Sequence, residues 1–339
     1  MSKIALITGI SGQDGAYLGK LLLDKGYTVI GADRRSARDD KWRLRKLGIE
    51  NKIVIEDFEL SEISQIIRIF NKYKISEVYN LAAQSFVGSS FLNPISTSDV
   101  TGLGVLRILE VIRNLKYKPK FYQASSSEMF GDVIQTPQKM TTPFNPVSPY
   151  AIAKLFAHYT TINYRRAYGL FTVSGICFNH ESPLRGEDFI TRKITTGLSK
   201  VKAGLLDCLE VGNIDAKRDW GFAGDYVHAM WLMLQQKKAR DYIIATGKTY
   251  TVRQFINESI KYFGFDAYWV GKNENEKLKL KKNNKTIIKI NKKFYRPNEV
   301  DKLLGDSSLT EKYLKWKPSI NFKSLVKMMS LSDLEIYNK

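Results

Sequence analysis

The side chains best suited to chemistry are Ser126 and Glu128, which follow an apolar run, and Tyr150 and Lys154 downstream. A tyrosine and a lysine four residues apart share one helix face, so the ammonium is expected to lower the pKa of the phenol and make it a usable base. A hydroxyl and a carboxylate two residues apart at a strand end face one cleft, which puts Ser127 on the opposite side in a structural role. Tyrosine, lysine and serine suffice to move a hydride on and off a nicotinamide, and the carboxylate would allow further chemistry.

Strands alternate with helices from the N-terminus, and this order positions those side chains. Such alternation predicts an α/β fold with a doubly wound parallel sheet of the Rossmann type, in which ligands bind at the carboxyl ends of the strands. The strands are expected at residues 4–8, 27–32, 52–55, 77–81, 120–124 and 171–178, with helical spacing at residues 16–25 and 103–115.

Three glycines, Gly9, Gly12 and Gly15, lie between the first strand and the first helix, with Gln13 and Asp14 among them. Glycine permits a tight turn and a close backbone approach, and the helix N-terminus receives a pyrophosphate. The position of the triplet therefore predicts a dinucleotide site.

The end of the second strand should select the cofactor. A lone Asp33 favours a free ribose 2′-hydroxyl, whereas Arg34, Arg35 and Ser36 favour a 2′-phosphate. We therefore predict NADP, the alternative being that the arginines are solvated loop residues. Further cofactor contacts are expected after the third and fourth strands, at Asp57, Phe58, Leu81, Ala82 and Ala83, although ordinary strand-end turns would look the same.

Composition restricts the function classes. The formal charge of +19 suggests nucleic acid, but much of the excess lies in residues 277–293, which we interpret as a solvated insertion or hairpin, and an anionic nucleotide would also benefit from a basic field. We expect no nucleic-acid partner, no membrane span and no metal site, since the three histidines have no spaced partners. Two cysteines and no leader-like N-terminus predict a reduced, cytoplasmic location.

The domain pattern changes near residue 179, where regular alternation ends. We expect a cofactor-binding domain at residues 1–178 and a smaller lobe for substrate at residues 179–339, with residues 214–248 returning to the first domain.

Several motifs together resemble one known family. The glycine pattern and the tyrosine–lysine pair are similar to those of extended short-chain dehydrogenases/reductases. Residues 121–128, 148–154, 178–186, 218–221 and 295–299 resemble the GDP-mannose 4,6-dehydratases specifically, and they span nearly the whole chain.

The resemblance implies a role for each catalytic candidate. Tyr150 takes the hydroxyl proton at C4 of the sugar, Lys154 holds the nicotinamide ribose, and Ser126 assists where most members have threonine. Glu128 removes the C5 proton and helps to expel water from C6. The implied product is a 4-keto-6-deoxy sugar, and the enzyme is a lyase with an internally recycled NADP.

The resemblance also implies binding residues and an assembly. Arginines suit a diphosphate because they form bidentate hydrogen bonds. A loop with Arg34, Ser36 and Arg38 reaches a neighbouring subunit in the family, which implies a homodimer or homotetramer. The implied contacts are His180 and Arg185 for the cofactor, and Ser85, Asn179, Lys193, Gly212, Arg218, Arg296 and Glu299 for the GDP-linked sugar.

Departures from the family leave alternatives open. Ser126 replaces threonine, and Val147 and Phe91 stand where many or some members have arginine and tryptophan, which could enlarge the sugar pocket. GDP-D-glycero-D-manno-heptose therefore competes with GDP-D-mannose as substrate. A GDP-sugar 4-epimerase or 4-reductase would not need Glu128. A non-catalytic nucleotide-binding protein would need none of the four catalytic candidates, which are Ser126, Glu128, Tyr150 and Lys154.

Overall fold

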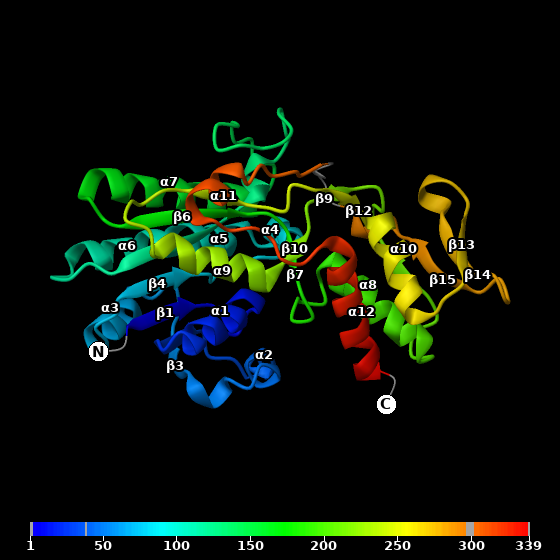
Figure 1. Ribbon diagram of the computed structural model, residues 1–339, viewed down its shortest axis with the longest axis horizontal. Coiled ribbons are helices and arrows are strands. Elements are labelled where there is room, and N and C mark those ends of the chain that lie inside the picture. Colours follow the sequence, from blue (N-terminus) through cyan, green and yellow to red (C-terminus); the bar gives the residue numbers. More distant parts are fainter. Residues whose placement is uncertain (1–2, 38, 296–301, 338–339) are drawn as a thin grey trace.

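A seven-stranded parallel sheet forms the centre of the larger lobe (Figure 1). The computed structural model describes residues 3–37, 39–295 and 302–337. The strand order is β11-β6-β5-β4-β1-β2-β3, so the chain reverses direction across the sheet between β1 and β4, where such folds bind ligands. The predicted doubly wound fold is confirmed. The strands are β1 (Ile4–Thr8), β2 (Thr28–Asp33), β3 (Val54–Asp57), β4 (Glu77–Asn80), β5 (Lys120–Ser126), β6 (Thr172–Cys177) and β11 (Tyr242–Ile244).

Helices cover both faces of this sheet (Figure 1). On one face, α1 (Gln13–Asp24) packs beside α9 (Ala223–Leu234), and their buried side chains include Leu18, Leu22 and Met230. On the other face lie α3 (Ile63–Lys72), α6 (Gly104–Asn114) and α7 (Pro149–Tyr168). The helical spacing of apolar residues puts each stripe against the strands, which buries the sheet on both sides as parallel sheets require.

Short helices lie between the longer elements. None of them has more than seven residues. They are α2 (Trp42–Lys46), η1 (Glu50–Lys52), α4 (Val87–Leu92), α5 (Pro94–Ser98), the π-helix η2 (Asp99–Leu103), η3 (Ser127–Phe130) and α11 (Ser308–Leu314).

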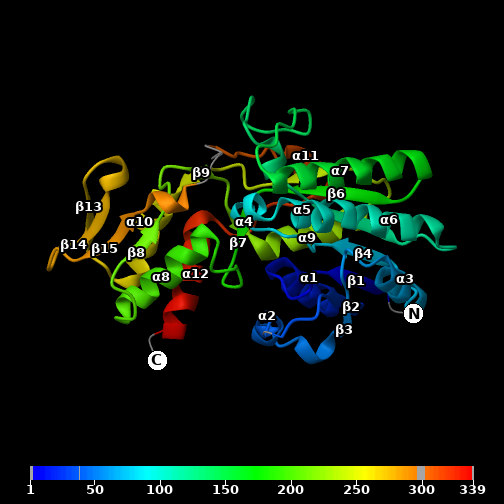
Figure 2. The same ribbon diagram turned by 180° about the vertical axis from the view of Figure 1, so that it is seen from behind.

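The smaller lobe lies at one end of the molecule in both views (Figures 1 and 2). Its sheet has the order β13-β14-β15-β8, with α8 (Ile190–Lys202), α10 (Val252–Phe263) and α12 (Phe322–Tyr337) packed together beside it. The strands and the two 3₁₀ turns of this lobe are β8 (Leu209–Val211), β13 (Ala267–Val270), η4 (Asn273–Asn275), β14 (Lys277–Leu280), β15 (Thr286–Ile290) and η5 (Lys292–Phe294).

Residues 277–293 form a hairpin, which confirms one of the two predicted alternatives, and this hairpin is a structural part of the sheet and not a solvated insertion. The segment forms the hairpin β14–β15, and β15 also pairs in parallel with β8. Leu278, Ile287 and Ile288 are fully buried, while the lysines between them project outward. The lysine-rich composition hides these buried residues, and since Ile287 and Ile288 are neighbours, β15 is buried on both faces at this point.

The chain crosses between the lobes more than once. After α8 and β8, helix α9 packs on α1, and β11 joins the edge of the large sheet next to β6. Two small sheets lie at the crossings and tie distant segments together. They consist of β7 (His180–Glu181) with β10 (Gly221–Phe222), and β9 (Lys217–Arg218) with β12 (Tyr250–Thr251).

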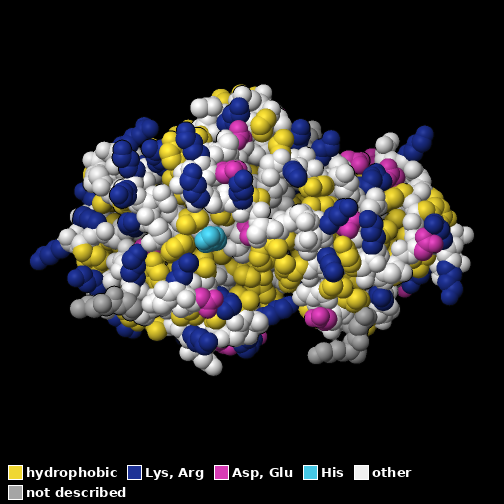
Figure 3. Space-filling model, in the orientation of Figure 1, with side chains coloured by type: hydrophobic (Ala, Val, Ile, Leu, Met, Phe, Trp, Pro, Cys, Tyr) yellow, Lys and Arg dark blue, Asp and Glu magenta, His cyan; other side chains and the backbone are white. Residues whose placement is uncertain are grey.

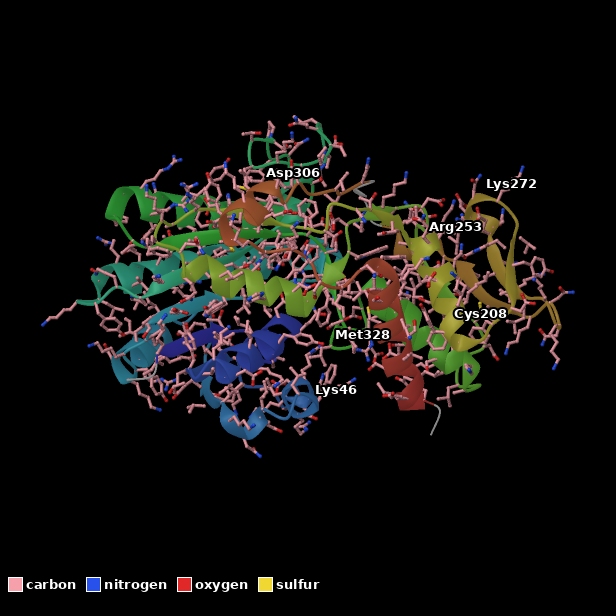
Figure 4. The ribbon with its side chains drawn as sticks, in the orientation of Figure 1. Lys46, Cys208, Arg253, Lys272, Asp306 and Met328 are labelled. Atoms are coloured by element: carbon pink, nitrogen blue, oxygen red, sulfur yellow. The ribbon has the colours of Figure 1, made fainter. Side chains whose placement is uncertain are left out.

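The face drawn in Figure 3 shows no obvious patch of one charge among its described residues. On the face in Figure 3, lysine and arginine side chains are scattered over both lobes among neutral and apolar ones. Cys208, labelled in Figure 4, lies in the smaller lobe, whereas Cys177 ends β6, and both are free thiols. None of the described helices combines the length and hydrophobicity needed to cross a bilayer.

Candidate active site

The turn after β1 is shaped for a phosphate group. Gly9 has a φ of +72°, and a Cβ on Gly15 would lie only 2.3 Å from the Gly9 carbonyl oxygen. Gly12 is the N-cap of α1, whose amides therefore point out of the turn. Together these residues form a cradle that side chains would fill, and it fits a dinucleotide pyrophosphate.

The end of β2 holds the residues predicted to select the cofactor. Asp33 accepts hydrogen bonds from the amide and hydroxyl of Ser11 and from the amide of Arg34. Arg34, Arg35 and Ser36 are exposed beside it. The Asp33 carboxylate is thus already hydrogen-bonded to the glycine-rich turn and to its own neighbour, whereas Arg34 and Arg35 are exposed to solvent.

The ends of β3 and β4 approach the same turn. Phe58 is buried and its amide donates to the Asp33 carbonyl, whereas Asp57 is exposed. The hydroxyl of Thr8 accepts from the amides of Leu81 and Ala82, both at 3.1 Å. Of the three residues predicted after β4, the ones whose side chains line the cleft are Leu81 and Ala83, and Ala82 packs against Gly9.

The four catalytic candidates line one cleft together with the glycine-rich turn. Ser126 ends β5, and its hydroxyl accepts from the amide of Glu128 at 3.2 Å. Tyr150 and Lys154 lie on the first turns of α7, which begins at Pro149 after its N-cap, Ser148. The empty space within the cleft is about 1000 Å³, including the part open to solvent.

The prediction for Ser127 is wrong, and the reason is local geometry. Residues 127–130 form the 3₁₀ helix η3, so strand alternation stops at Ser126. Ser127 is buried and lines the same cleft as Ser126 and Glu128. A helical turn, not a strand, brings the hydroxyl and the carboxylate together.

Burial controls the pKa values of the tyrosine and the lysine. It raises the pKa of Tyr150 above its ordinary value of 10, and the Ser126 hydroxyl opposes this, while the Glu128 carboxylate adds to it. Burial lowers the pKa of Lys154 to about 8. The lysine Nζ donates to the Ala124 carbonyl at 2.7 Å and lies 5.8 Å from the centre of the tyrosine ring. The expected lowering of the phenol pKa by Lys154 is therefore not found.

A polar network joins the glycine-rich turn to the segment after β6. Gln13 donates to the His180 carbonyl at 3.0 Å and accepts from Ser182, and Asp14 lies 2.7 Å from the His180 Nε2. Burial lowers the pKa of His180, but Asp14 more than offsets this, so the pKa is raised. Arg185 lines the cleft with its guanidinium over the Phe189 ring, 3.6 Å from the centroid.

The residues predicted for the sugar nucleotide fall into two groups. Ser85 and Asn179 line the cleft, and the side-chain oxygen of Asn179 is buried without a hydrogen-bond partner among the described residues. Lys193 on α8 and Gly212 after β8 both contact Phe294. Arg218 lies on β9, and its side chain is buried. Arg296 and Glu299 lie outside the residues that the structure describes.

The departures at Val147 and Phe91 do not lie in the cleft wall. Val147 packs against a cluster that contains Met129, Phe130 and Phe178, and neither Val147 nor Phe91 lines the cleft. This corrects the expectation that the two residues enlarge the sugar pocket. Ser126 is the departure that does line it.

Sequence reasoning assigned no site role to several lining residues, although some of them lie within the quoted motifs at residues 121–128 and 178–186. Ser125 forms a 3.0 Å hydrogen bond with the buried His158, and its place directly before Ser126 was the available signal. Three histidine, cysteine or acidic side chains do not converge on a possible metal position anywhere in residues 3–37, 39–295 and 302–337. The missed residues are Val87, Ala124, Ser125, Ser127, Cys177, Phe178 and Phe189.

Comparison with known proteins agrees with this arrangement. A model of the family described as GDP-mannose 4,6 dehydratase matches residues 6–329. The chain is 47% identical to the GDP-mannose 4,6 dehydratase of Cricetulus griseus over 98% of this chain and 92% of that protein. It is 48% identical to the GDP-mannose 4,6-dehydratase of Vibrio cholerae serotype O1, over 98% and 94%.

Solved structures show the same fold at lower identity. A dTDP-glucose 4,6-dehydratase from Streptomyces venezuelae with NAD bound has a TM-score of 0.83 at 18% identity, over 98% of this chain and 97% of that chain. A UDP-glucose 4-epimerase from Thermotoga maritima has a TM-score of 0.82 at 22% identity, over 98% and 99%. The fold is thus shared by dehydratases and epimerases, and the residues of the site must separate the two.

Proposed function

The chain belongs to the GDP-mannose 4,6-dehydratase family, and we propose that it uses NADP to convert GDP-D-mannose or GDP-D-glycero-D-manno-heptose to the 4-keto-6-deoxy sugar. Membership confirms the predicted class of reaction, GDP-sugar 4,6-dehydration by a hydro-lyase with a nicotinamide cofactor. The observation that carries the proposal is that Glu128 lines the same cleft as Ser126, Tyr150 and Lys154.

Each catalytic side chain has a task that its position supports. A bound nicotinamide would supply the hydride chemistry of the reaction, which is oxidation at C4 and reduction at C6. Tyr150 takes the proton of the C4 hydroxyl, and the Ser126 hydroxyl stabilises its anion, since a hydrogen bond to the charged form opposes the effect of burial. Lys154 supplies a buried ammonium beside the phenol.

Glu128 turns an oxidation into an elimination. A ketone at C4 acidifies the C5 proton, so the Glu128 carboxylate can remove it, and the C6 hydroxyl takes up a proton and leaves as water. The two protons that Tyr150 and Glu128 remove are given back, one to the departing C6 hydroxyl and one to C5, and the hydride taken from C4 would be placed on C6. The net change is the loss of one water, and the cofactor ends in its starting state. A 4-epimerase or 4-reductase has no step that requires this carboxylate.

The choice of NADP rests on the end of β2. Asp33 already accepts three hydrogen bonds from Ser11 and Arg34, which favours a 2′-phosphate beside Arg34 and Arg35 over a free 2′-hydroxyl on Asp33. Gly9, Gly12 and Gly15 would hold the pyrophosphate. The other residues proposed to contact the cofactor are Gln13, Asp14, Ser36, Asp57, Phe58, Leu81, Ala82, Ala83, His180 and Arg185.

The smaller lobe is proposed to bind the GDP moiety. Asn179 presents a buried, unsatisfied oxygen to the cleft, and such a group gains a partner when a ligand binds. Ser85, Lys193, Gly212, Arg218, Arg296 and Glu299 remain the proposed contacts of the nucleotide sugar, as the family resemblance implies.

A second copy of the chain is the proposed partner in a homodimer or homotetramer. The outer face of α7 exposes Ile152, Phe156 and Tyr159, which are 55%, 44% and 54% accessible. With Leu106 and Leu155 these side chains line a shallow apolar groove between α6 and α7. An exposed apolar surface built from two neighbouring helices is suited to a symmetric contact, in which the same surface of two copies of the chain meets.

The deciding experiment offers each GDP-sugar to the purified protein and measures the product mass. A decrease by one water with either sugar supports the proposal, and the relative kcat/KM values identify the substrate. An isomer of unchanged mass would instead indicate a 4-epimerase. Absence of water loss from both sugars would exclude them as substrates.

A further inference from the structure

Lys193 lies directly over an aromatic ring in the smaller lobe. Its Nζ is 3.2 Å from the ring centroid of Phe294. Lys193 belongs to α8, and Phe294 ends the 3₁₀ helix η5. We propose that Phe294 is a positioning residue that holds the Lys193 ammonium ready for the diphosphate of the nucleotide sugar. The inference rests on the proposed function, because it assumes a nucleoside-diphosphate sugar as ligand.

Lys193 lies on the first turn of α8, which begins directly after the cleft residue Phe189. Its amide donates to the Phe189 carbonyl at 2.8 Å, one turn earlier, and Phe189 lines the cleft. This bond ties the first turn of α8, which carries Lys193, to its N-cap Phe189 at the cleft. Arg185 lies over the Phe189 ring in the same manner. Two cations, each packed on an aromatic ring, thus succeed one another from the cleft into the smaller lobe.

Asn291 holds the 3₁₀ turn that carries Phe294 in place. The Asn291 side chain caps η5 by accepting from the amide of Lys293 at 3.0 Å. Its own amide donates to the Val211 carbonyl at 2.8 Å, and its side-chain nitrogen donates to Glu210 at 2.7 Å. Since Glu210 and Val211 belong to β8, the turn that carries the ring is anchored to a sheet strand.

Gly212 makes room for this arrangement. A Cβ at Gly212 would lie 2.7 Å from the Phe294 carbonyl oxygen. Any other residue would push the η5 backbone away from β8 and move the ring from beneath Lys193. The structure thus gives Gly212 a steric role in seating Phe294, in addition to the substrate contact that the family resemblance implies.

The ring leaves the ammonium able to bind an anion. An ammonium has three donors, and the ring face occupies one side, so the others are available for phosphate oxygens. Glu210, the nearest competitor on β8, is engaged with Lys289 at 2.9 Å and with Asn291. Burial lowers the pKa of Lys193, and the Glu210 and Asp188 carboxylates oppose that effect. A lysine restrained before binding loses less conformational freedom when the ligand arrives.

Calorimetric titration of the holoenzyme with GDP tests the role of Phe294. We expect Phe294→Leu to raise the Kd by about three- to tenfold, because the apolar volume remains while the π face is lost. Phe294→Tyr keeps the face and should bind as the wild type does. In a Lys193→Met background, Phe294→Leu should have no further effect. Tyr268→Leu, at an exposed aromatic residue of the same lobe, is the matched control.

Steady-state kinetics with the GDP-sugar separates positioning from general damage to the fold. Phe294→Leu should raise KM and leave kcat unchanged, because it weakens binding in the ground state and the transition state equally. Equal losses in Phe294→Leu and Phe294→Tyr, or an effect that persists without Lys193, would overturn the inference and leave the proposed function intact. Wild-type protein that does not bind GDP would overturn both.

Discussion

The carbonyl oxygen of Ala124 accepts a 2.7 Å hydrogen bond from the ammonium of Lys154. The side chain of Gln123 donates to the same oxygen at 3.1 Å and accepts from Asn80 at 2.8 Å. Asn80 accepts in turn from the Thr8 hydroxyl at 2.7 Å. All of these side chains are buried, so a continuous polar chain runs from β1 through β4 and β5 to α7 and fixes the lysine at the end of the sheet.

Lys154→Met is expected to stabilise the protein while it abolishes dehydration. Burial lowers the pKa of Lys154 from 10.5 to about 8. The unfolded chain therefore binds more protons between these values, and the stability of the wild type rises with pH across that interval. Below pH 8 the folded wild type bears the full free-energy cost of the buried ammonium. The unfolding free energy of the variant at pH 7 should therefore exceed that of the wild type by on the order of 1–3 kcal/mol.

Denaturant titrations of the wild type and Lys154→Met between pH 7 and pH 10 measure this effect. The difference in unfolding free energy should shrink as the pH rises through 8 and vanish near 10. The same substitution at the exposed Lys116 should change stability little at any pH. A Lys154→Met protein that is less stable than the wild type, by an amount independent of pH, would contradict the argument.

Gly15→Ala should damage the cofactor site far more than Gly12→Ala. The Cβ at position 15 would lie 2.3 Å from the Gly9 carbonyl oxygen and 2.6 Å from the Ile10 Cα, whereas at position 12 the nearest atom is 3.1 Å away. Backbone atoms cannot move aside as a flexible side chain can. We expect Gly15→Ala to lose cofactor binding by at least about a hundredfold, and Gly12→Ala to lose about tenfold or less.

Equilibrium binding of NADP to protein stripped of cofactor distinguishes the two variants, with circular dichroism to confirm that both are folded. Similar affinities for NADP in the two variants would show that the turn relaxes and that the close contact at Gly15 does not matter.

The large sheet was predictable because its strands are buried on both faces and read as short apolar runs between helices. Residues 4–8 were predicted with the bounds that β1 has, and the other predicted strands overlap the observed ones with ends shifted by up to two residues. A hairpin was one of the two alternatives predicted for residues 277–293, but its place in a larger sheet was not predicted, because β15 pairs with β8, a neighbour far away in sequence. The composition of a segment shows that it is rich in lysine, but it cannot show that the segment pairs with a distant strand such as β8.

The catalytic residues were recognisable because they form motifs, whereas their environment was not. Lys154 and Tyr150 could be found from their spacing, but the pKa of each depends on burial under the assembled lobes. The position of Ser127 depends on a single 3₁₀ turn, which the sequence does not specify. The contact between Lys193 and Phe294 joins residues of α8 and η5 that are far apart in the chain.

Arg34→Ala combined with Arg35→Ala is expected to weaken NADP binding relative to NAD by about ten- to a hundredfold. Hydrogen bonds from arginine to a phosphate are charge-assisted. Both arginine side chains are exposed beside Asp33, whose carboxylate already accepts a hydrogen bond from Ser11. The comparison requires stripped protein and titration with each cofactor. Arg45→Ala, at an exposed arginine of α2 that pairs with Asp39 and Glu50, should leave the ratio unchanged. An unaltered preference in the double variant would contradict the assignment to NADP.

Glu128→Gln should stop water loss and leave the earlier steps in place. The amide keeps the size of the side chain but cannot accept the C5 proton, so the rate of elimination should fall by about 10²–10⁴-fold. The protein should still bind its cofactor, and the absorbance of reduced nicotinamide should appear when the GDP-sugar is added, because Tyr150, Lys154 and Ser126 remain in the cleft.

Product mass and nicotinamide absorbance, followed in parallel, separate the elimination from the oxidation at C4. Ser127→Ala is the matched control, since Ser127 is the buried neighbour of Glu128 in the same cleft and has no proton to remove in this scheme. It should retain most of the dehydration rate. Full dehydration by Glu128→Gln would show that another base removes the C5 proton, and the feature that separates this site from an epimerase would then lie outside Glu128.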